Sequence, residues 1–443
     1  MTVFSLDTAQ TAWCAELRTL AAERLRPLAE KGEPGRVNRP LVAELGRLGL
    51  LARLFTSGAL DLCLMRESLA QVCTEAETAL ALQGLGAHPV HAYGTRAQRA
   101  YWLPRVSDGT AVAAFALSEP AAGSDAAALA LRADRAAPHT AGAPPGTAPG
   151  ADSGALAAER AGAPAVAEAG MPAEAAPTGS PVSGAEVRAL PADEAGTGAV
   201  AEADGAGRWR LTGEKCWISN APEADFYTVF ARTTAGAGAR GVTAFLVPAD
   251  RPGLTGAPLD MLSPHPIGTL AFDGVPVTAD DVLGEPDRGF RVAMGTLNLF
   301  RPSVGAFAVG MAGAALEAAL AHTARREAFG GKLKDLQTVA HQVAEMALRT
   351  EAARLMVYAA AAAYDEGAPD VPRRAAMAKL LATETAQYVV DAAVQLHGAR
   401  ALRRGHLLEH LYREVRAPRV YEGASEVQRA IIAKELYASR EAS

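Results

Sequence analysis

The sequence Phe115-Ala-Leu-Ser-Glu-Pro-Ala-Ala-Gly-Ser-Asp125 begins as an apolar, strand-like run and ends in a turn of small and hydroxyl-bearing residues. Ser118 and Ser124 offer side-chain donors and acceptors. Pro120 and Gly123 predict a sharp bend, which would bring the backbone close to a bound group. We interpret the stretch as a ligand-binding loop. In isolation an ordinary hairpin with solvated serines would be the better interpretation, so the choice depends on the rest of the chain.

The hydrophobic period changes on either side of this loop. From Asp7 to about Thr110, apolar residues recur at helical spacing, with a Gly-rich connection predicted at Gln83–His88. From Val112 onward, β-branched or aromatic segments alternate with turns, which predicts strands at 112–118, 208–212, 225–232, 242–247 and 267–272. After Gly289 the helical period returns in three or four long, alanine-rich segments, which predicts a helical bundle.

These patterns predict an α+β multi-domain protein. An N-terminal helical domain would span residues 1–111. A middle β domain, barrel-like or sandwich-like, would span residues 112–285. A C-terminal bundle would span residues 286–443.

Residues 133–207 fit neither period. Of these 75 residues, 47 are Ala, Gly or Pro and none is Phe, Trp or Tyr. Such a segment buries too little apolar surface to offset the entropy lost on ordering, and its nine prolines interrupt any long helix. We predict a disordered insertion that loops out of the β domain, because strand-like sequence stands on both sides. Its two flanks would then be neighbours in space.

The composition restricts the class of protein. The chain has 443 residues, is 49% hydrophobic and carries a formal charge of −6 without a block of consecutive Lys or Arg, which argues against nucleic acid as a partner. Its four cysteines show no C-x-x-C spacing and no signal peptide is evident, so we expect a reduced, cytoplasmic protein. The apolar run Pro302–Leu316 is too short to span a membrane and predicts a close-packed internal helix.

Two further motifs have simpler interpretations. Gly236–Gly241 has the letters of a dinucleotide fingerprint, but a strand-like run follows where that motif needs a helix N-terminus, which favours a β-turn. His406-Leu-Leu-Glu-His410 has the spacing of a zinc-binding H-x-x-E-H, yet basic residues flank it, which favours a partly exposed helical segment. Neither a G-x-S-x-G sequence nor a P-loop lysine pattern occurs, which disfavours serine hydrolases and NTPases.

Five segments, taken in order, resemble the acyl-CoA dehydrogenase family of flavoproteins. They are Phe115–Asp125, Leu211–Asn220, Arg326–Gly330 with Gln337, Gln395–Gly398 and Arg413–Arg429. The A-L-S-E-P-x-x-G-S-D and Y-E-G-A-S-E-V-Q-R runs are each specific, and the resemblance covers the chain apart from the insertion. It implies an N-terminal helical domain, a middle β domain and a C-terminal four-helix bundle, the same order that the hydrophobic periods indicate.

The resemblance implies FAD as cofactor, held between the β domain and the bundle. A neighbouring subunit of a homodimer or homotetramer would hold part of the dinucleotide. Ser118 would hydrogen-bond the pyrimidine side of the flavin, and Trp217 and Ser219 would flank its ring. Both serines stand where the family commonly has threonine.

Two more segments match cofactor contacts of the family. One, with Arg326, Phe329 and Gln337, would contact the FAD of the partner subunit. The other contains Gln395 and Gly398. Two glycines that follow in the family are alanines here, at positions 399 and 401, which would keep the backbone further from the cofactor.

Glu422 matches the family's catalytic base in its Y-E-G context. In other members the base directly precedes an arginine on the first helix of the bundle, and Phe300 occupies that position here. The chain therefore offers one of the two known placements of the base. The resemblance also implies substrate-binding roles for Ser124, Arg301, Tyr421 and Gly423.

These residues imply FAD-dependent α,β-dehydrogenation of an acyl thioester carried by coenzyme A or a carrier protein. Glu422 would remove the α proton and the flavin would accept the β hydride. An electron-transferring flavoprotein would then take the electrons. Two alternatives stay open: an oxygen-using flavin oxidase or monooxygenase of the same fold, and a non-catalytic scaffold whose insertion recruits partners.

Overall fold

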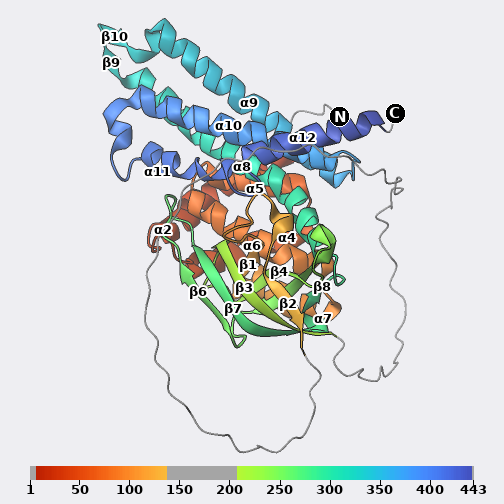
Figure 1. The fold of residues 1–443 in the computed structure, drawn as a ribbon. Coiled ribbons are helices and arrows are strands. Elements are labelled where there is room, and N and C mark those ends of the chain that lie inside the picture. Colours follow the sequence, from red (N-terminus) through yellow and green to blue (C-terminus); the bar gives the residue numbers. More distant parts are fainter. Residues whose placement is uncertain (1–5, 137–206, 442–443) are drawn as a thin grey trace, which may run out of the picture. The chain divides into compact units, whose positions relative to one another are not determined.

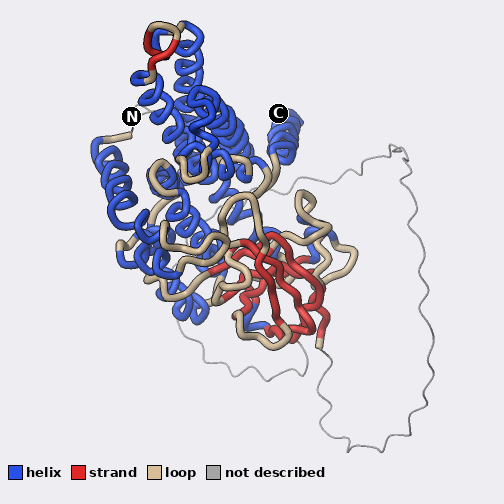
Figure 2. The backbone as a smooth tube through the Cα atoms, turned by 90° about the vertical axis from the view of Figure 1, so that its left-hand side faces the viewer, coloured by secondary structure: helices blue, strands red, loops and turns tan. Residues whose placement is uncertain are grey.

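The computed structural model describes residues 6–136 and 207–441 (Figures 1 and 2). Helices precede and follow a central sheet in these residues, so the predicted α+β class is confirmed. Figure 2 shows the strands of this sheet gathered apart from the long C-terminal helices. Most of the insertion predicted at 133–207 lies outside the described residues, and its disorder stays a prediction.

The N-terminal part of the described chain is helical, as predicted. Its helices are α1 (Thr8–Leu20), α2 (Arg26–Ala29), α3 (Arg39–Arg47), α4 (Leu50–Thr56), α5 (Ala59–Ala70), α6 (Thr74–Tyr93) and α7 (Arg96–Ser107). Capping boxes begin α1 and α7, because the Asp7 and Thr95 side chains accept from backbone N–H groups three residues later. Leucines from α1, α3, α4, α5 and α6 share one apolar core.

Helix α6 is continuous, and so the predicted connection at Gln83–His88 is wrong. The glycines in it serve close packing. A Cβ at Gly84 would lie 2.8 Å from the ring of Phe300, and a Cβ at Gly86 would lie 2.6 Å from the backbone nitrogen of Ala114. Glycine here lets a later helix and the first strand approach α6 closely, which outweighs its weak helix propensity.

The middle domain is a sheet of eight strands within the described residues. They are β1 (Ala113–Ala116), β2 (Arg132–Arg135), β3 (Arg208–Ser219), β4 (Phe226–Arg232), β5 (Val242–Pro248), β6 (Leu254–Pro258), β7 (Ile267–Thr278) and β8 (Val282–Leu283). Hydrogen-bonded neighbours follow the order β6-β7-β3-β2-β4-β5-β8, and β1 pairs with β4 in parallel. Side chains alternate along β4: Tyr227 and Val229 pack within the sheet domain, whereas Phe226 and Phe230 pack with α6 and α7. All five predicted strands are present.

Strand β2 corrects one boundary of the predicted insertion. Residues 133–135 belong to β2, which pairs antiparallel with β3. Leu131 and Ala133 are buried while Arg132 and Asp134 are exposed, the alternation of a half-buried strand. The alternation is too short to stand out beside the Ala-rich and Gly-rich sequence that follows it.

The two ends of the undescribed segment 137–206 are adjacent in the sheet. The Ala136 N–H donates to the Arg208 carbonyl oxygen at 3.0 Å. Replacing residues 137–206 with a single Asn would connect Ala136 to Arg208 through a two-residue loop, the new Asn followed by Gly207. Asn-Gly is the favoured sequence of a type I′ turn. We expect this deletion variant to match the full chain in thermal unfolding midpoint and in bound flavin per protein. A loss of either would show that the segment contributes to the fold or to the cofactor site.

The C-terminal part is a helical bundle, as predicted. Its elements are α8 (Gly289–Arg325), a small hairpin of β9 (Glu327–Ala328) and β10 (Gly331–Lys332), α9 (Gln337–Asp365), α10 (Val371–His397), α11 (Leu407–Glu414) and α12 (Ser425–Glu441). Alanines dominate the core between α8, α9 and α10, which lets the helices approach closely. At Gly305 of α8 a Cβ would lie 2.7 Å from the side chain of Val357 in α9.

Helix α8 is long and apolar enough to cross a membrane, the one such helix in the described ranges. However, 67% of its most apolar window is buried inside the protein. It contacts α5, α9 and α10. The internal helix predicted from Pro302–Leu316 is therefore confirmed.

Candidate active site

Glu422 lies in a short loop before α12. Glu422 and Gly423, which we call the Glu422 loop, both have left-handed backbone, with φ of 52° and 95°. The Glu422 carbonyl oxygen accepts from Arg301 Nε at 3.3 Å and from Gln428 Nε2 at 3.2 Å. The Gly423 carbonyl oxygen accepts from Lys379 Nζ at 2.7 Å and from Gln428 Nε2 at 2.8 Å. Three helices, α8, α10 and α12, thus hold the loop in a conformation that a non-glycine residue adopts at a cost of about 1–2 kcal/mol.

The Glu422 carboxylate keeps one oxygen without a partner. Oε2 is buried and forms no hydrogen bond with any described residue. The Glu422 backbone N–H likewise donates to no acceptor in residues 6–136 and 207–441. A buried acceptor without a hydrogen-bond partner costs free energy unless a ligand satisfies it, which indicates a binding site at Glu422.

Burial raises the pKa of the Glu422 carboxyl above its ordinary value. The cationic side chains of Arg66, Lys379 and Arg301 oppose this shift. Because the largest effect is desolvation, the carboxylate is a stronger base here than in water. This is the property that a general base for a weakly acidic carbon requires.

Arg66 belongs to a buried polar cluster beside Glu422 that the sequence analysis missed. Its Nε donates to Glu77 of α6 in a buried ion pair, and its Nη1 donates to Ser303 of α8 at 2.7 Å. Arg66 is 3% exposed and stands within the apolar helix α5. The available sequence signal was an arginine directly after the apolar run Leu62–Met65, since a charge at a buried position requires a buried partner.

The loop after β1 is tied to β3 through Lys215. Lys215 Nζ donates to the Leu117 carbonyl oxygen at 2.9 Å and pairs with Glu119 Oε1 at 2.7 Å. Burial lowers the pKa of Lys215 to about 8, and the Glu119 carboxylate opposes that shift. The Cys216 N–H donates to the Ser118 carbonyl oxygen at 3.0 Å. The structure therefore brings the two predicted flavin segments together, at Ser118 and at the end of β3.

Trp217 has the geometry of a residue that faces a ligand. The pairing of β3 with β7 shifts register between Lys215 and Ile218, and Trp217 has a positive φ of 57°. This irregularity turns the indole outward, so that 48% of Trp217 is exposed. Ser219 ends the same strand and is partly exposed. The exposed indole, on a strand hydrogen-bonded to Ser118, offers a flat face of the kind that packs against an aromatic ring.

Three family models match the chain. The model of the acyl-CoA dehydrogenase N-terminal domain matches residues 7–110. The middle-domain model matches residues 179–275, and the C-terminal-domain model matches residues 287–437. The chain belongs to the acyl-CoA dehydrogenase family. The family consists of flavin oxidoreductases with FAD as cofactor, so the predicted enzyme class and cofactor follow from membership.

Individual proteins and structures of this family are also similar to the chain. The protein named "probable acyl-CoA dehydrogenase FadE25" of Mycobacterium tuberculosis is 38% identical over 231 residues, which are 52% of this chain and 59% of that protein. The mitochondrial short-chain specific acyl-CoA dehydrogenase of Bos taurus is 31% identical and aligns with 95% of this chain and 88% of its own length. The structure of butyryl-CoA dehydrogenase from Megasphaera elsdenii superposes with a TM-score of 0.78 at 27% identity, over 98% of this chain and 99% of that one. The predicted three-domain fold is that of the family.

The other cofactor residues predicted from the family resemblance lie in the bundle, at the connection between α8 and α9 and at the end of α10. Arg326 directly follows α8, Phe329 is 89% exposed at the tip of the β9–β10 hairpin, and Gln337 begins α9. Gln395 and Gly398 are exposed at the end of α10. Figure 1 shows this hairpin far from the sheet that carries Trp217. In the described part of the chain no backbone hydrogen bond joins this hairpin to the loop after β1, so the predicted cofactor residues fall into two groups.

The substrate positions of the family divide between two places. Arg301, Tyr421 and Gly423 lie at the Glu422 loop, and burial lowers the pKa of Arg301 while Glu422 raises it. Ser124 is exposed in the loop after β1. The structure therefore places three of the four predicted substrate residues around Glu422.

The glycine motif Gly236–Gly241 lies in a turn, and the histidine motif His406–His410 lies at the start of α11. Gly236–Gly241 forms the turn between β4 and β5, and a strand follows it. In the histidine motif, Glu409 pairs with Arg413 and His410 contacts Thr74. No group of residues suited to a metal ion occurs among the described residues.

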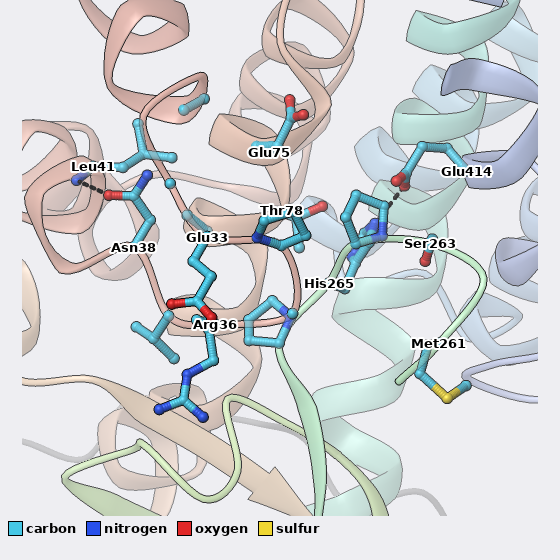
Figure 3. A pocket seen from close by; sticks show the side chains of 18 of the residues that line it. Glu33, Arg36, Asn38, Leu41, Glu75, Thr78, Met261, Ser263, His265 and Glu414 are labelled. Carbon is cyan, nitrogen blue, oxygen red and sulfur yellow. Dashed lines mark hydrogen bonds and ion pairs between the residues drawn. The ribbon is translucent and has the colours of Figure 1, made fainter. Parts of the chain in front are cut away.

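A separate cavity of about 950 Å³ lies between the α2–α3 loop, α6 and the β6–β7 loop (Figure 3). Its wall contains the ion pair between His265 and Glu414, and Glu414 holds the pKa of His265 above its ordinary value despite burial. Neither Glu422 nor Trp217 lines this cavity. The candidate active site therefore does not coincide with it.

Proposed function

We propose that the protein catalyses α,β-dehydrogenation of an acyl thioester, with Glu422 as the base that removes the α proton. The observation that carries this proposal is the buried, unpartnered Oε2 of Glu422 beside its own unpartnered backbone N–H. FAD, when bound, supplies the acceptor for the β hydride.

Two properties of the Glu422 loop support the proton abstraction. Burial raises the pKa of the carboxyl, which makes the carboxylate a better proton acceptor. The free N–H of Glu422 can donate to the thioester carbonyl oxygen, where negative charge develops as the α proton leaves. Arg66, Arg301 and Lys379 surround the carboxylate with positive charge, which offsets that developing charge.

We assign the cofactor contacts by the same reasoning. Ser118, Trp217 and Ser219 would hold the flavin ring, since they are accessible and adjacent. Arg326, Phe329, Gln337, Gln395 and Gly398 would hold the dinucleotide of a partner subunit. The separation of the two groups of cofactor residues within one chain supports a homodimer or homotetramer.

The substrate contacts follow from the position of the Glu422 loop. Arg301, Tyr421 and Gly423 would line the thioester end of the substrate, and Ser124 would contact its carrier arm. The carrier is coenzyme A in this proposal. The electron acceptor is an electron-transferring flavoprotein in the cytoplasm.

The rate of dehydrogenation is expected to depend on pH through Glu422. The carboxyl must be deprotonated to act as a base, and burial raises its pKa. Activity should therefore be low at acidic pH and rise through a midpoint above the ordinary carboxyl value. The pH profile of kcat/KM measures this midpoint. A midpoint at or below the ordinary value would contradict the assignment.

The acceptor decides between this function and its nearest alternative. Purified protein is mixed with short-chain, branched and long-chain acyl-CoA thioesters, with either an electron-transferring flavoprotein or dissolved oxygen as sole acceptor. We expect enoyl-CoA product with the flavoprotein and little oxygen consumption. Stoichiometric oxygen consumption would instead establish the oxidase or monooxygenase. Absence of both product and bound flavin would favour the scaffold.

A further inference from the structure

Lys379 is a buried lysine whose ammonium group contacts a backbone carbonyl in place of a carboxylate. It lies in α10, is 0% exposed, and donates from Nζ to the Gly423 carbonyl oxygen at 2.7 Å. The other fully buried lysine, Lys215, has a carboxylate at 2.7 Å, whereas no described residue forms an ion pair with Lys379. A buried charge without an ion partner is costly, so its presence at the Glu422 loop suggests a role in the reaction.

The Glu422 loop needs external support to keep its shape. A left-handed conformation at Glu422 is unfavourable for a residue with a Cβ. Lys379 and Gln428 share the Gly423 carbonyl oxygen, and Arg301 and Gln428 share that of Glu422. Because each peptide plane is rigid, fixing the Glu422 carbonyl also fixes the N–H of Gly423, and fixing the Gly423 carbonyl fixes the N–H of Ala424. The donors therefore hold the two peptide planes that directly follow the Glu422 Cα, the atom from which its carboxylate side chain projects.

We propose that Lys379 is a positioning residue for the reaction: it anchors the Gly423 carbonyl and so aims the Glu422 carboxylate at the α carbon of the substrate. The proposal rests on the proposed role of Glu422. Lys379 touches neither substrate nor cofactor in this arrangement and acts through the loop.

Lys379 has a second, electrostatic effect on the base. Burial lowers the pKa of Lys379 to about 8, opposed chiefly by Glu422 and, more weakly, by Glu384 and Glu426, while Arg301 adds to the lowering. In return, the ammonium charge holds down the pKa that burial raises at Glu422. Removing the charge would destabilise the carboxylate and shift the midpoint of activity to higher pH.

These two effects can be separated with four variants of the FAD-bound protein. Lys379→Met removes donor and charge, Lys379→Arg keeps both, and Gln428→Met removes a donor alone. Thr383→Val is the matched control, because Thr383 is buried one turn further along α10 and bonds only within its own helix. The measured quantities are bound FAD, the KM for acyl-CoA, and the rate of anaerobic flavin reduction as a function of pH.

We expect Lys379→Met to retain FAD and KM, to reduce the flavin roughly 10²-fold more slowly, and to show a midpoint at higher pH. Lys379→Arg should recover part of the rate and return the midpoint toward the wild-type value. Gln428→Met should slow reduction without moving the midpoint. Thr383→Val should behave like the wild type.

A Lys379→Met protein with the wild-type rate of flavin reduction and the wild-type pH midpoint would overturn the proposal. So would a loss of rate no greater than that of Thr383→Val. If Lys379→Met does not fold, Gln428→Met and Lys379→Arg carry the test. A wild-type rate for Gln428→Met would then contradict the proposal that the donors to the Glu422 loop position the carboxylate. Failure of the proposed function looks different, because wild-type protein would then not be reduced by any acyl-CoA.

Discussion

Replacing Glu422 with glutamine is expected to abolish most of the turnover while leaving the fold and the flavin in place. Glutamine has the same shape and can occupy the same left-handed loop, but it cannot accept the α proton. General-base catalysis contributes roughly 10²–10⁴-fold, so a rate loss in that range is expected. The measurement is the rate of anaerobic flavin reduction by acyl-CoA, with bound FAD and the thermal unfolding midpoint determined in parallel.

Glu426→Gln provides the matched control for this variant. Glu426 lies four residues further along the chain and pairs with Arg429 at 3.5 Å on the exposed surface of α12. The same chemical change there should leave the rate of flavin reduction unaltered. Equal rates for Glu422→Gln and the wild type would remove Glu422 from the role of base.

Replacing Lys215 with methionine is expected to destabilise the β domain and to release the flavin. Methionine leaves the Glu119 carboxylate buried without its cation, although Glu119 still accepts from the Leu131 N–H at 2.9 Å. Breaking a buried ion pair by removing one partner costs roughly 3–5 kcal/mol. Because Lys215 also holds the Leu117 carbonyl, the adjacent Ser118 should lose its position. Urea unfolding measures the free energy lost, and flavin absorbance per protein measures the cofactor retained.

Arg132→Met tests whether removing any positive charge from this sheet would destabilise the domain and release the flavin. Arg132 is on β2 and pairs with Asp134 at 3.5 Å, with both side chains more than half exposed. Exposed pairs contribute about 0–1 kcal/mol, so this variant should unfold like the wild type and keep its flavin. If Lys215→Met were equally harmless, the buried pair would not be what positions the Ser118 loop.

The sequence patterns predicted the order of the domains and five strands, because helices and strands bury their faces with different periods. They failed where packing partners are distant in sequence. Gly84 and Gly86 predicted a connection, yet they lie inside α6 because Phe300 and β1 press against it. The short strands β2, β6 and β8 carry too few residues to show an alternation of their own.

The candidate site shows the same limit. Motifs identified Glu422 and Trp217, because residues near these positions in sequence carry the pattern. Lys379, which holds the Glu422 loop from another helix, has no local motif, and neither has Arg66. The left-handed backbone conformation of Glu422 likewise could not be predicted from the sequence, since hydrogen-bond donors from three helices hold it. Support for a site comes from tertiary structure, which a linear motif does not record.

The central claim is that Glu422 removes the α proton of an acyl thioester, at a site where FAD, when bound, would supply the acceptor for the β hydride. Its most direct test is an anaerobic titration of the yellow protein with a panel of acyl-CoA thioesters, with the loss of the visible flavin band recorded for the wild type and for Glu422→Gln. We predict rapid bleaching of the wild type by at least one thioester, formation of the corresponding enoyl-CoA, and bleaching of Glu422→Gln that is slower by roughly 10²-fold or more. A flavin-bound wild-type protein that no acyl-CoA bleaches would contradict the account.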